Sequence, residues 1–203
     1  MLFQKGIVEF NNWLENYYRD FGKEIDTLAA PLITDYAAAV LPVAQDEINS
    51  DFDISPQYQD FQREYKDYFI ARYVKSSDGQ LRAIARDAQE AGENEAEAIE
   101  QRLTEWEEKR PDKITMRETV RAENAFARSV FALSGISKIR SIAYGTNCPY
   151  CQALDGMVIG IDSFFLTKGN FQPEGAKEPL TVTSNCSHPP FHSGCDCGIT
   201  ANI

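Results

Sequence analysis

The five cysteines of this chain all lie after residue 147, and their distribution constrains the fold more than any other feature. They are Cys148, Cys151, Cys186, Cys195 and Cys197. A secreted disulfide framework usually spreads an even number of cysteines through a short chain. Here the number is odd and the clustering is tight. Residues 1–28 also carry too many charges for a signal peptide. The pattern favours reduced thiols in a cytoplasm, held by a metal ion.

The cysteines form two short motifs that resemble the two halves of one metal site. Two thiolates two residues apart face one ion through a tight turn, and a second pair of ligands completes a tetrahedron. We predict one structural zinc ion held by four of five residues, which are Cys148, Cys151, His192, Cys195 and Cys197. Cys148, Cys151 and Cys195 are the first choices, and His192 and Cys197 compete for the fourth position. Cys186 and His188 are weaker candidates, expected to be loop residues.

The segment between the two halves explains why a metal ion is needed. Forty-three residues separate Cys151 from Cys195, and closing a flexible loop of that length costs on the order of 3 kcal/mol. A structural zinc ion contributes roughly 10–16 kcal/mol of apparent binding free energy in small peptides. Residues 166–190 are expected to form a long irregular loop. Two other states stay open at this point: a reduced cluster without metal, or one disulfide between the halves.

Catalytic uses of these residues have less support in the sequence. Residues 148–151 read Cys-Pro-Tyr-Cys, a redox motif that glutaredoxins carry near the start of a βαβ unit, whereas here it follows mostly helical sequence. Zinc deaminases require His-x-Glu, and neither His188 nor His192 has a Glu two residues later. There is also no phosphate-binding or dinucleotide motif. We therefore expect a protein that is not an enzyme.

The first half of the chain has the apolar periodicity of amphipathic helices. Residues spaced three or four apart predict a helix over 3–28, and they are Phe3, Ile7, Phe10, Leu14, Tyr17, Phe21, Ile25 and Leu28. Pro31 and Pro42 are expected to interrupt it, which leaves a shorter helix over 32–50. A third helix is predicted over about 57–75.

The middle of the chain is also predicted to be helical, with several breaks. Residues 76–79 read as a break before a helix over 80–109, whose acidic part (90–100) is a solvated face or a mobile loop. Pro111 is expected to end that helix. Thr115–Glu118 has the spacing of a capping box, so the next helix begins there and runs to Gly135.

The last part of the chain changes character. Residues 136–144 predict a strand or a short helix, and Asp155–Gly156 predicts a hairpin turn. The expected fold is therefore mainly α: a helical N-terminal two-thirds and a small α+β, zinc-stabilised C-terminal subdomain. The predicted organisation is a helical region over 1–76 and a second domain over 77–203.

The charge balance limits the classes of partner. The chain has 31 acidic and 20 basic side chains, a formal net charge of −11. Because DNA affinity rests largely on neutralising phosphates, this charge gives DNA binding only weak support. A basic protein partner is better matched. No stretch reads as the ~20 apolar residues of a spanning helix, so we expect no membrane partner, and no small-molecule substrate is expected either.

The order of several short motifs resembles one known family. Residues 117–124 read Arg-Glu-Thr-Val-Arg-Ala-Glu-Asn. Cys148-x-x-Cys151 and Leu154-Asp155-Gly156 follow, and residues 189–197 read Pro-Pro-Phe-His-Ser-Gly-Cys-Asp-Cys. This order is similar to the Mu F-like minor head, or head-morphogenesis, proteins of tailed bacteriophages. The resemblance covers about residues 80–197. The chain departs from the family pattern at Ser193–Gly194, and at Asp196, where the family usually has Arg.

The resemblance implies a structural role in a virion. It implies a minor capsid component of a phage or prophage head that acts near the portal in head morphogenesis or DNA delivery. The implied partners are the portal and the major capsid protein. The implied locations are the virion and, during assembly, the bacterial host cytoplasm. The loss of the Arg at 196 further weakens DNA binding. The alternatives are a toxin-like, zinc- or thiol-dependent enzyme acting on nucleic acid or protein, and a zinc-bearing adaptor module.

Overall fold

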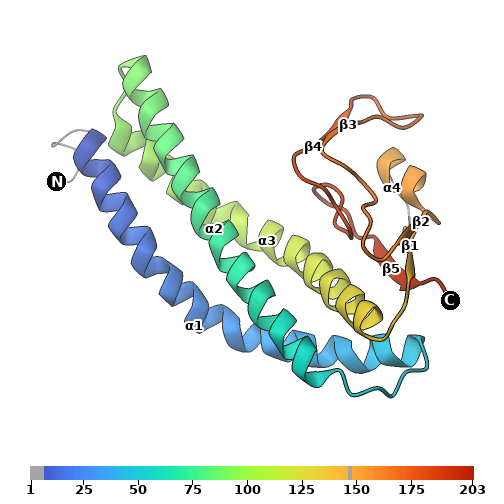
Figure 1. Cartoon of the computed structure of the whole chain (residues 1–203). Helices are drawn as coiled ribbons and strands as arrows, with labels where there is room; N and C mark the ends of the chain where they lie inside the picture. The colour runs from blue at the N-terminus through green and yellow to red at the C-terminus, as the bar shows by residue number, and fades with distance from the viewer. Residues whose placement is uncertain (1–6, 146–147) are drawn as a thin grey trace. The chain divides into compact units, whose positions relative to one another are not determined.

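The structure, a computed structural model, describes residues 7–145 and 148–203, with side chains from Phe10 onward. Three long helices come first: α1 (Ile7–Glu47), α2 (Ser55–Ala91) and α3 (Glu95–Leu133). A region with short strands follows them, coloured orange to red in Figure 1. The predicted fold class, mainly α with a small α+β C-terminal part, is confirmed. Phe3, at the start of the predicted 3–28 helix, lies outside the described residues.

The two prolines of α1 do not interrupt it, so the predicted separate helix over 32–50 is wrong. Both Pro31 and Pro42 are exposed inside the 41-residue helix. Proline's fixed φ suits a helix, and its main cost is a backbone carbonyl left without a helical donor. Ala29, Ala37 and Ala44 are all buried at spacings of eight and seven residues. One packed face of α1 therefore continues past both prolines, and its packing outweighs their tendency to end a helix.

The predicted break at residues 76–79 is also wrong, because α2 is continuous there. Ser77 is buried, and its hydroxyl oxygen accepts a hydrogen bond from Arg110 Nη2 at 2.8 Å. Leu81, Ala85 and Ala88 follow it on the same buried face. Tertiary packing of this face outweighs the weak helix propensity of Ser and Gly.

The start of α3 lies about twenty residues before the predicted one. Gly92 has a φ of 70° and ends α2, and Asn94 then caps α3. The Asn94 side-chain oxygen accepts the N–H groups of Ala96 at 3.0 Å and Glu97 at 3.4 Å. The helix continues through Pro111. Thr115 therefore lies inside α3 and does not begin a helix. The Thr119 hydroxyl donates a hydrogen bond to the Thr115 carbonyl at 2.9 Å.

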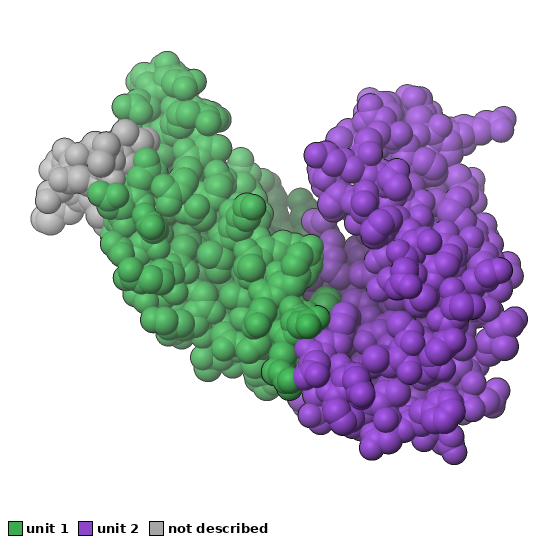
Figure 2. All heavy atoms as spheres, in the orientation of Figure 1, with its two compact units in different colours: residues 1–33, 63–113 green, residues 34–62, 114–203 purple. Residues whose placement is uncertain are grey.

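The chain divides into two compact units, each discontinuous in sequence (Figure 2). Unit 1 contains residues 1–33 and 63–113, and unit 2 contains residues 34–62 and 114–203. The core of unit 1 combines Phe10, Leu14 and Tyr18 of α1 with Leu81 and Ala85 of α2 and with Ile99 of α3. The predicted division into regions 1–76 and 77–203 stays a prediction; residues 76 and 77 lie inside α2.

Unit 2 contains the strands. β1 (Lys138–Ile142) lies between β2 (Val158–Gly160) and β5 (Gly198–Ala201) in an antiparallel sheet of order β2-β1-β5. β3 (Gly169–Phe171) pairs with β4 (Leu180–Val182). The short helix α4 (Pro149–Leu154) lies between β1 and β2 in sequence. In the helical part of unit 2, the ring of Phe126 on α3 contacts Tyr58 and Phe61 on α2, with centroids 6.0 and 5.7 Å apart.

Three predictions for this region have clear outcomes. Residues 136–144 contain the strand β1, one of the two predicted alternatives. Gly156 has a φ of 72°, as a tight turn requires, but this turn joins α4 to β2 and not two strands. The segment 166–190 is not an irregular loop throughout, because it contains the β3–β4 pair and a bridge between Leu166 and Cys186.

One helix bears on the expected absence of a membrane partner. Within the described residues, α1 alone is long and apolar enough, over Phe10–Glu47, to cross a membrane by length and composition. By length and composition, the expectation that the chain has no stretch apolar enough to span a membrane is therefore wrong. Length and composition are weak evidence for a span, because the core helix of a soluble protein passes the same test.

The capping of α3 gives a prediction that separates the observed helix start from the predicted one. Asn94→Ala should lower the free energy of unfolding by about 1 kcal/mol, because the N–H groups of Ala96 and Glu97 lose their acceptor. Asn94→Asp should retain most of the stability. Thr115→Ala should have a smaller effect than Asn94→Ala. Urea unfolding followed by circular dichroism measures all three, and the reverse ranking would show that α3 begins at Thr115.

Candidate metal centre

The first half of the centre is the beginning of α4. Cys148 is the N-cap residue of this helix, and Pro149 occupies its first turn, where a missing N–H costs nothing. Cys151 lies in the same turn, and its side chain is buried. The N–H of Gln152 donates a hydrogen bond to the Cys148 carbonyl at 3.0 Å and closes this turn. One helical turn thus supplies two sulfur ligands.

The second half is a tight turn in the C-terminal segment. The N–H of Cys195 bonds to the carbonyl of His192 at 3.3 Å, and Gly194 has a φ of 76° inside this turn. A left-handed residue at this point favours Gly, which gives the Ser193–Gly194 pair a structural reason. Cys195 and Cys197 are both buried, and Cys197 directly precedes β5.

The structure brings all five predicted residues together in two overlapping groups. In each group the candidate ligand atoms lie within 4.8 Å of one another: Cys148, Cys151 and His192 form one, and Cys151, Cys195 and Cys197 form the other. His192 Nε2 is 3.1 Å from Cys148 Sγ and 3.0 Å from Cys151 Sγ. Cys151 is the residue that the two groups share.

The distances and donor types fit a small thiophilic ion. The sulfur atoms of Cys151 and Cys195 are 3.9 Å apart, close to the roughly 3.8 Å that separates two thiolates on a tetrahedral zinc ion with Zn–S bonds of about 2.3 Å. All five cysteines are free, so no disulfide joins the two halves. The Cys/His cluster can hold a metal ion.

A backbone contact prepares His192 for coordination. Its Nδ1 lies 2.7 Å from the carbonyl oxygen of Ser193. Because a carbonyl oxygen only accepts hydrogen bonds, Nδ1 carries a proton, and Nε2 is the ring nitrogen that faces the two sulfurs. Metal-ligating histidines are typically oriented by this kind of contact.

The buried thiols control each other's protonation. A hydrogen bond from the Cys197 thiol lowers the pKa of Cys195 to about 5, and the same bond raises the pKa of Cys197. Burial raises the pKa of Cys151 to about 12. Without a cation, burial and this shared hydrogen bond therefore make Cys195 the most acidic of the three thiols. A bound divalent cation would favour deprotonation of the other two.

Helix α3 is tied to this centre by a residue that metal-ligand reasoning did not single out. Asn124 is buried, and its side-chain nitrogen donates to the carbonyl of Cys197 at 3.3 Å and to that of Val120 at 2.7 Å. Asp155, just after α4, accepts the N–H of Ala143 at 2.9 Å. Asn124 was signalled only by its place in the quoted motifs, and Asp155 by its motif and by the predicted Asp155–Gly156 turn.

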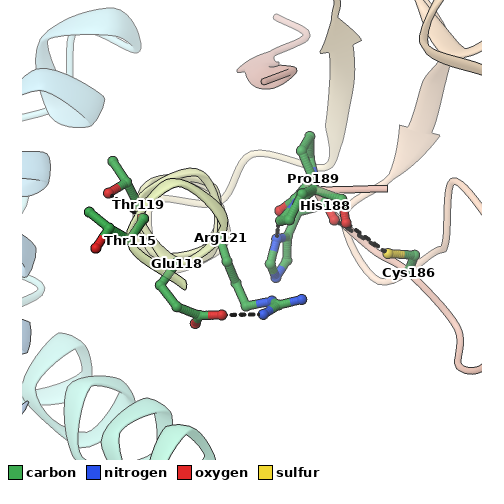
Figure 3. Close-up of polar contacts among 8 residues, drawn as sticks. Thr115, Glu118, Thr119, Arg121, Cys186, His188 and Pro189 are labelled. Carbon is green, nitrogen blue, oxygen red and sulfur yellow. Dashed lines mark hydrogen bonds and ion pairs between the residues drawn. The ribbon is translucent and has the colours of Figure 1, made fainter. Parts of the chain in front are cut away.

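Cys186 and His188 are in neither ligand group. Figure 3 shows them beside α3, on the side from which Arg121 extends. The Cys186 thiol lies 3.5 Å from the His188 carbonyl, and His188 Nδ1 lies 2.6 Å from the Pro189 carbonyl. Arg121 pairs with Glu118 at 2.6 Å, with only 15% and 12% of their side chains exposed. Burial raises the pKa of the Cys186 thiol, so it is a poor nucleophile.

No family model matches this chain, and neither the curated proteins nor the solved structures contain a match.

The protonation pattern gives a direct test of the centre. At pH 7 the medium lies above the pKa of Cys195 and below the pKa values of Cys151 and Cys197. Adding zinc to the metal-free protein at this pH should therefore release one proton from Cys151 and one from Cys197, if both coordinate. Calorimetry in buffers of different ionisation enthalpy measures the release. Zinc binding without proton release would exclude these two thiols as ligands.

Proposed function

We propose that this chain is an assembly protein of a tailed phage or prophage head, a minor capsid component whose C-terminal region is stabilised by one zinc ion. The observation that carries the proposal is that the motifs of the family resemblance converge in unit 2. Asn124, the last residue of the α3 motif, bonds to the Cys197 carbonyl of the terminal motif, and Cys151 contacts His192. Motifs that make one structural unit are better evidence than motifs that only share an order.

The donor set favours zinc in a structural role. Thiolates and imidazole suit zinc, and structural zinc sites have all four positions filled by protein, whereas catalytic sites keep one open for water. Here five protein donors compete for four positions. The imidazole of His192 faces sulfurs, so it is not placed as a general base toward a substrate. Non-enzymatic function follows as part of the proposal.

The metal supplies stability that the region lacks by itself. The strands of unit 2 have only three to five residues each, and 43 residues lie between Cys151 and Cys195. Closing that loop costs on the order of 3 kcal/mol, which a zinc ion offsets several times over. We infer that the ion orders the segment from α4 to β5 and that α3 carries this ordered segment.

The proposed partners are the portal and the major capsid protein, and the proposed locations are the virion and the host cytoplasm during assembly. The net charge of −11 supports a basic protein surface as the partner better than it supports DNA. The three long helices supply extended surfaces for such contacts. In this role the metal centre keeps unit 2 folded, and the contacts with the head are made elsewhere.

Complementation of a deleted gene tests the proposal. Heads purified from cells that lack the gene should include fewer DNA-filled particles, and the wild-type chain should restore them and co-purify with the heads. Cys151→Ser should fail, because it removes the ligand shared by both groups. The matched variant Cys186→Ser, in neither group, should complement. Absence of the wild-type chain from purified heads, measured by mass spectrometry, would refute the head role.

A further inference from the structure

The outer face of α1 in unit 1 exposes four large apolar side chains. Trp13 and Tyr17 are 39% and 44% exposed, and Leu28 and Leu32 are 71% and 70% exposed. Their spacings are four, eleven and four residues. At about 100° per residue, these spacings place the four side chains on one side of the helix, within an arc of about 100°. We call these four residues the α1 stripe.

The aromatic end of the α1 stripe is held in place by the core. The ring centroids of Phe10 and Trp13 are 6.2 Å apart, those of Trp13 and Tyr17 are 5.3 Å apart, and those of Tyr17 and Phe21 are 5.5 Å apart. All three pairs are stacked, and Phe10 is buried in the core of unit 1. The exposed rings are therefore already ordered. Ordered aromatic side chains that lose little entropy are typical anchors of protein interfaces.

The middle of the α1 stripe is acidic. Asp20 and Glu24 are exposed and lie between its two apolar halves. Asp20 pairs with Lys23 at 3.0 Å, a bond that lowers the pKa of its carboxyl group, and Arg19 Nε lies 3.9 Å from the same carboxylate. Glu24 has no cationic group within 4 Å among the residues that the structure describes. The surface thus reads apolar, acidic, apolar along about 30 Å of helix, at 1.5 Å per residue.

From this charge pattern we propose that the α1 stripe binds an amphipathic helix of a partner protein, whose apolar face carries Lys or Arg at its centre. The proposal rests on the assembly role and names the surface that performs it. The partner's cations would pair with Asp20 and Glu24 while its apolar residues cover the two ends of the stripe. Charge complementarity of this kind sets register and rejects wrong partners.

The same charges argue against two other occupants. A second copy of α1, parallel in register or antiparallel about the midpoint of the stripe, would bring the Asp20 and Glu24 carboxylates of both copies together. A lipid surface would have to accept the same two carboxylates at the centre of the contact, and anionic headgroups would repel them. A cationic helix is the occupant that neutralises Glu24 and that can share Asp20 with Lys23.

Two synthetic 18-residue helical peptides test the proposal with the metal-loaded full chain. Both carry a leucine face; one has two central lysines and the other two central glutamates. Fluorescence anisotropy of the labelled peptides should show at least tenfold tighter binding of the lysine peptide. Leu28→Ser with Leu32→Ser should weaken that binding at least tenfold. The matched variant Leu103→Ser, which removes an exposed leucine of α3, should leave it unchanged.

The charge-swapped variant Asp20→Lys with Glu24→Lys is the deciding arm, with circular dichroism confirming its fold. It should reverse the preference, so that the glutamate peptide binds tighter. Equal binding of both peptides, or no reversal, would overturn the proposal. A dimer that sedimentation analysis detects and that Leu28→Ser dissociates would also overturn it. Flotation of the protein with phosphatidylcholine–phosphatidylglycerol vesicles would do so too, if the flotation requires the same leucines. Because this assay uses no virion, its failure would leave the head complementation result intact.

Discussion

The contact of the His192 imidazole with the sulfurs of Cys148 and Cys151, and of Cys151 with two more thiols, is the constraint on which the C-terminal half of the molecule depends. Cys148 and Cys151 come from the first turn of α4, and His192, Cys195 and Cys197 come from a segment that begins 41 residues after Cys151. Buried thiols without a cation can hold little negative charge, so a metal ion is the natural complement of this arrangement. Asn124 then fixes the Cys197 backbone to α3. This hydrogen bond links the Cys/His cluster to α3 within unit 2.

The helices show where local sequence signals yield to packing. Pro31, Pro42 and Pro111 each predicted a helix end, yet all three lie inside helices. In α1 the buried alanines on both sides of the prolines keep one face in contact with its neighbours, and this gain exceeds the loss of a backbone hydrogen bond. Asn94 and Gly92, a conventional cap and a left-handed residue, mark the real boundary. The periodicity of apolar residues thus predicted the helices themselves better than proline predicted their ends.

The candidate site was predictable to the extent that it depends on spacing along the chain. Cys-x-x-Cys and His-x-x-Cys-x-Cys place their ligands through local turns, and the structure forms both turns with Pro149 and Gly194 in the conformations that these turns need. The contacts of Asn124 with Cys197 and of Asp155 with Ala143 depend on which segments meet in space, and spacing does not encode that. Of the four residues of the α1 stripe, Tyr17 and Leu28 belonged to the predicted periodic face, and Trp13 and Leu32 did not. The exposure of the stripe was not predictable, because a helix face is buried or exposed only by what packs against it.

X-ray absorption spectroscopy at the zinc edge of the protein, purified without added metal, tests the account most directly. The account predicts a tetrahedral first shell of thiolate sulfur with at most one imidazole nitrogen, Zn–S distances of about 2.3 Å, and about one zinc per chain. Cys151→Ser should lose this spectrum, and Cys186→Ser should retain it. A shell of oxygen ligands, or a chain that is folded and metal-free, would contradict the central claim that a closed Cys/His metal centre holds the C-terminal region together.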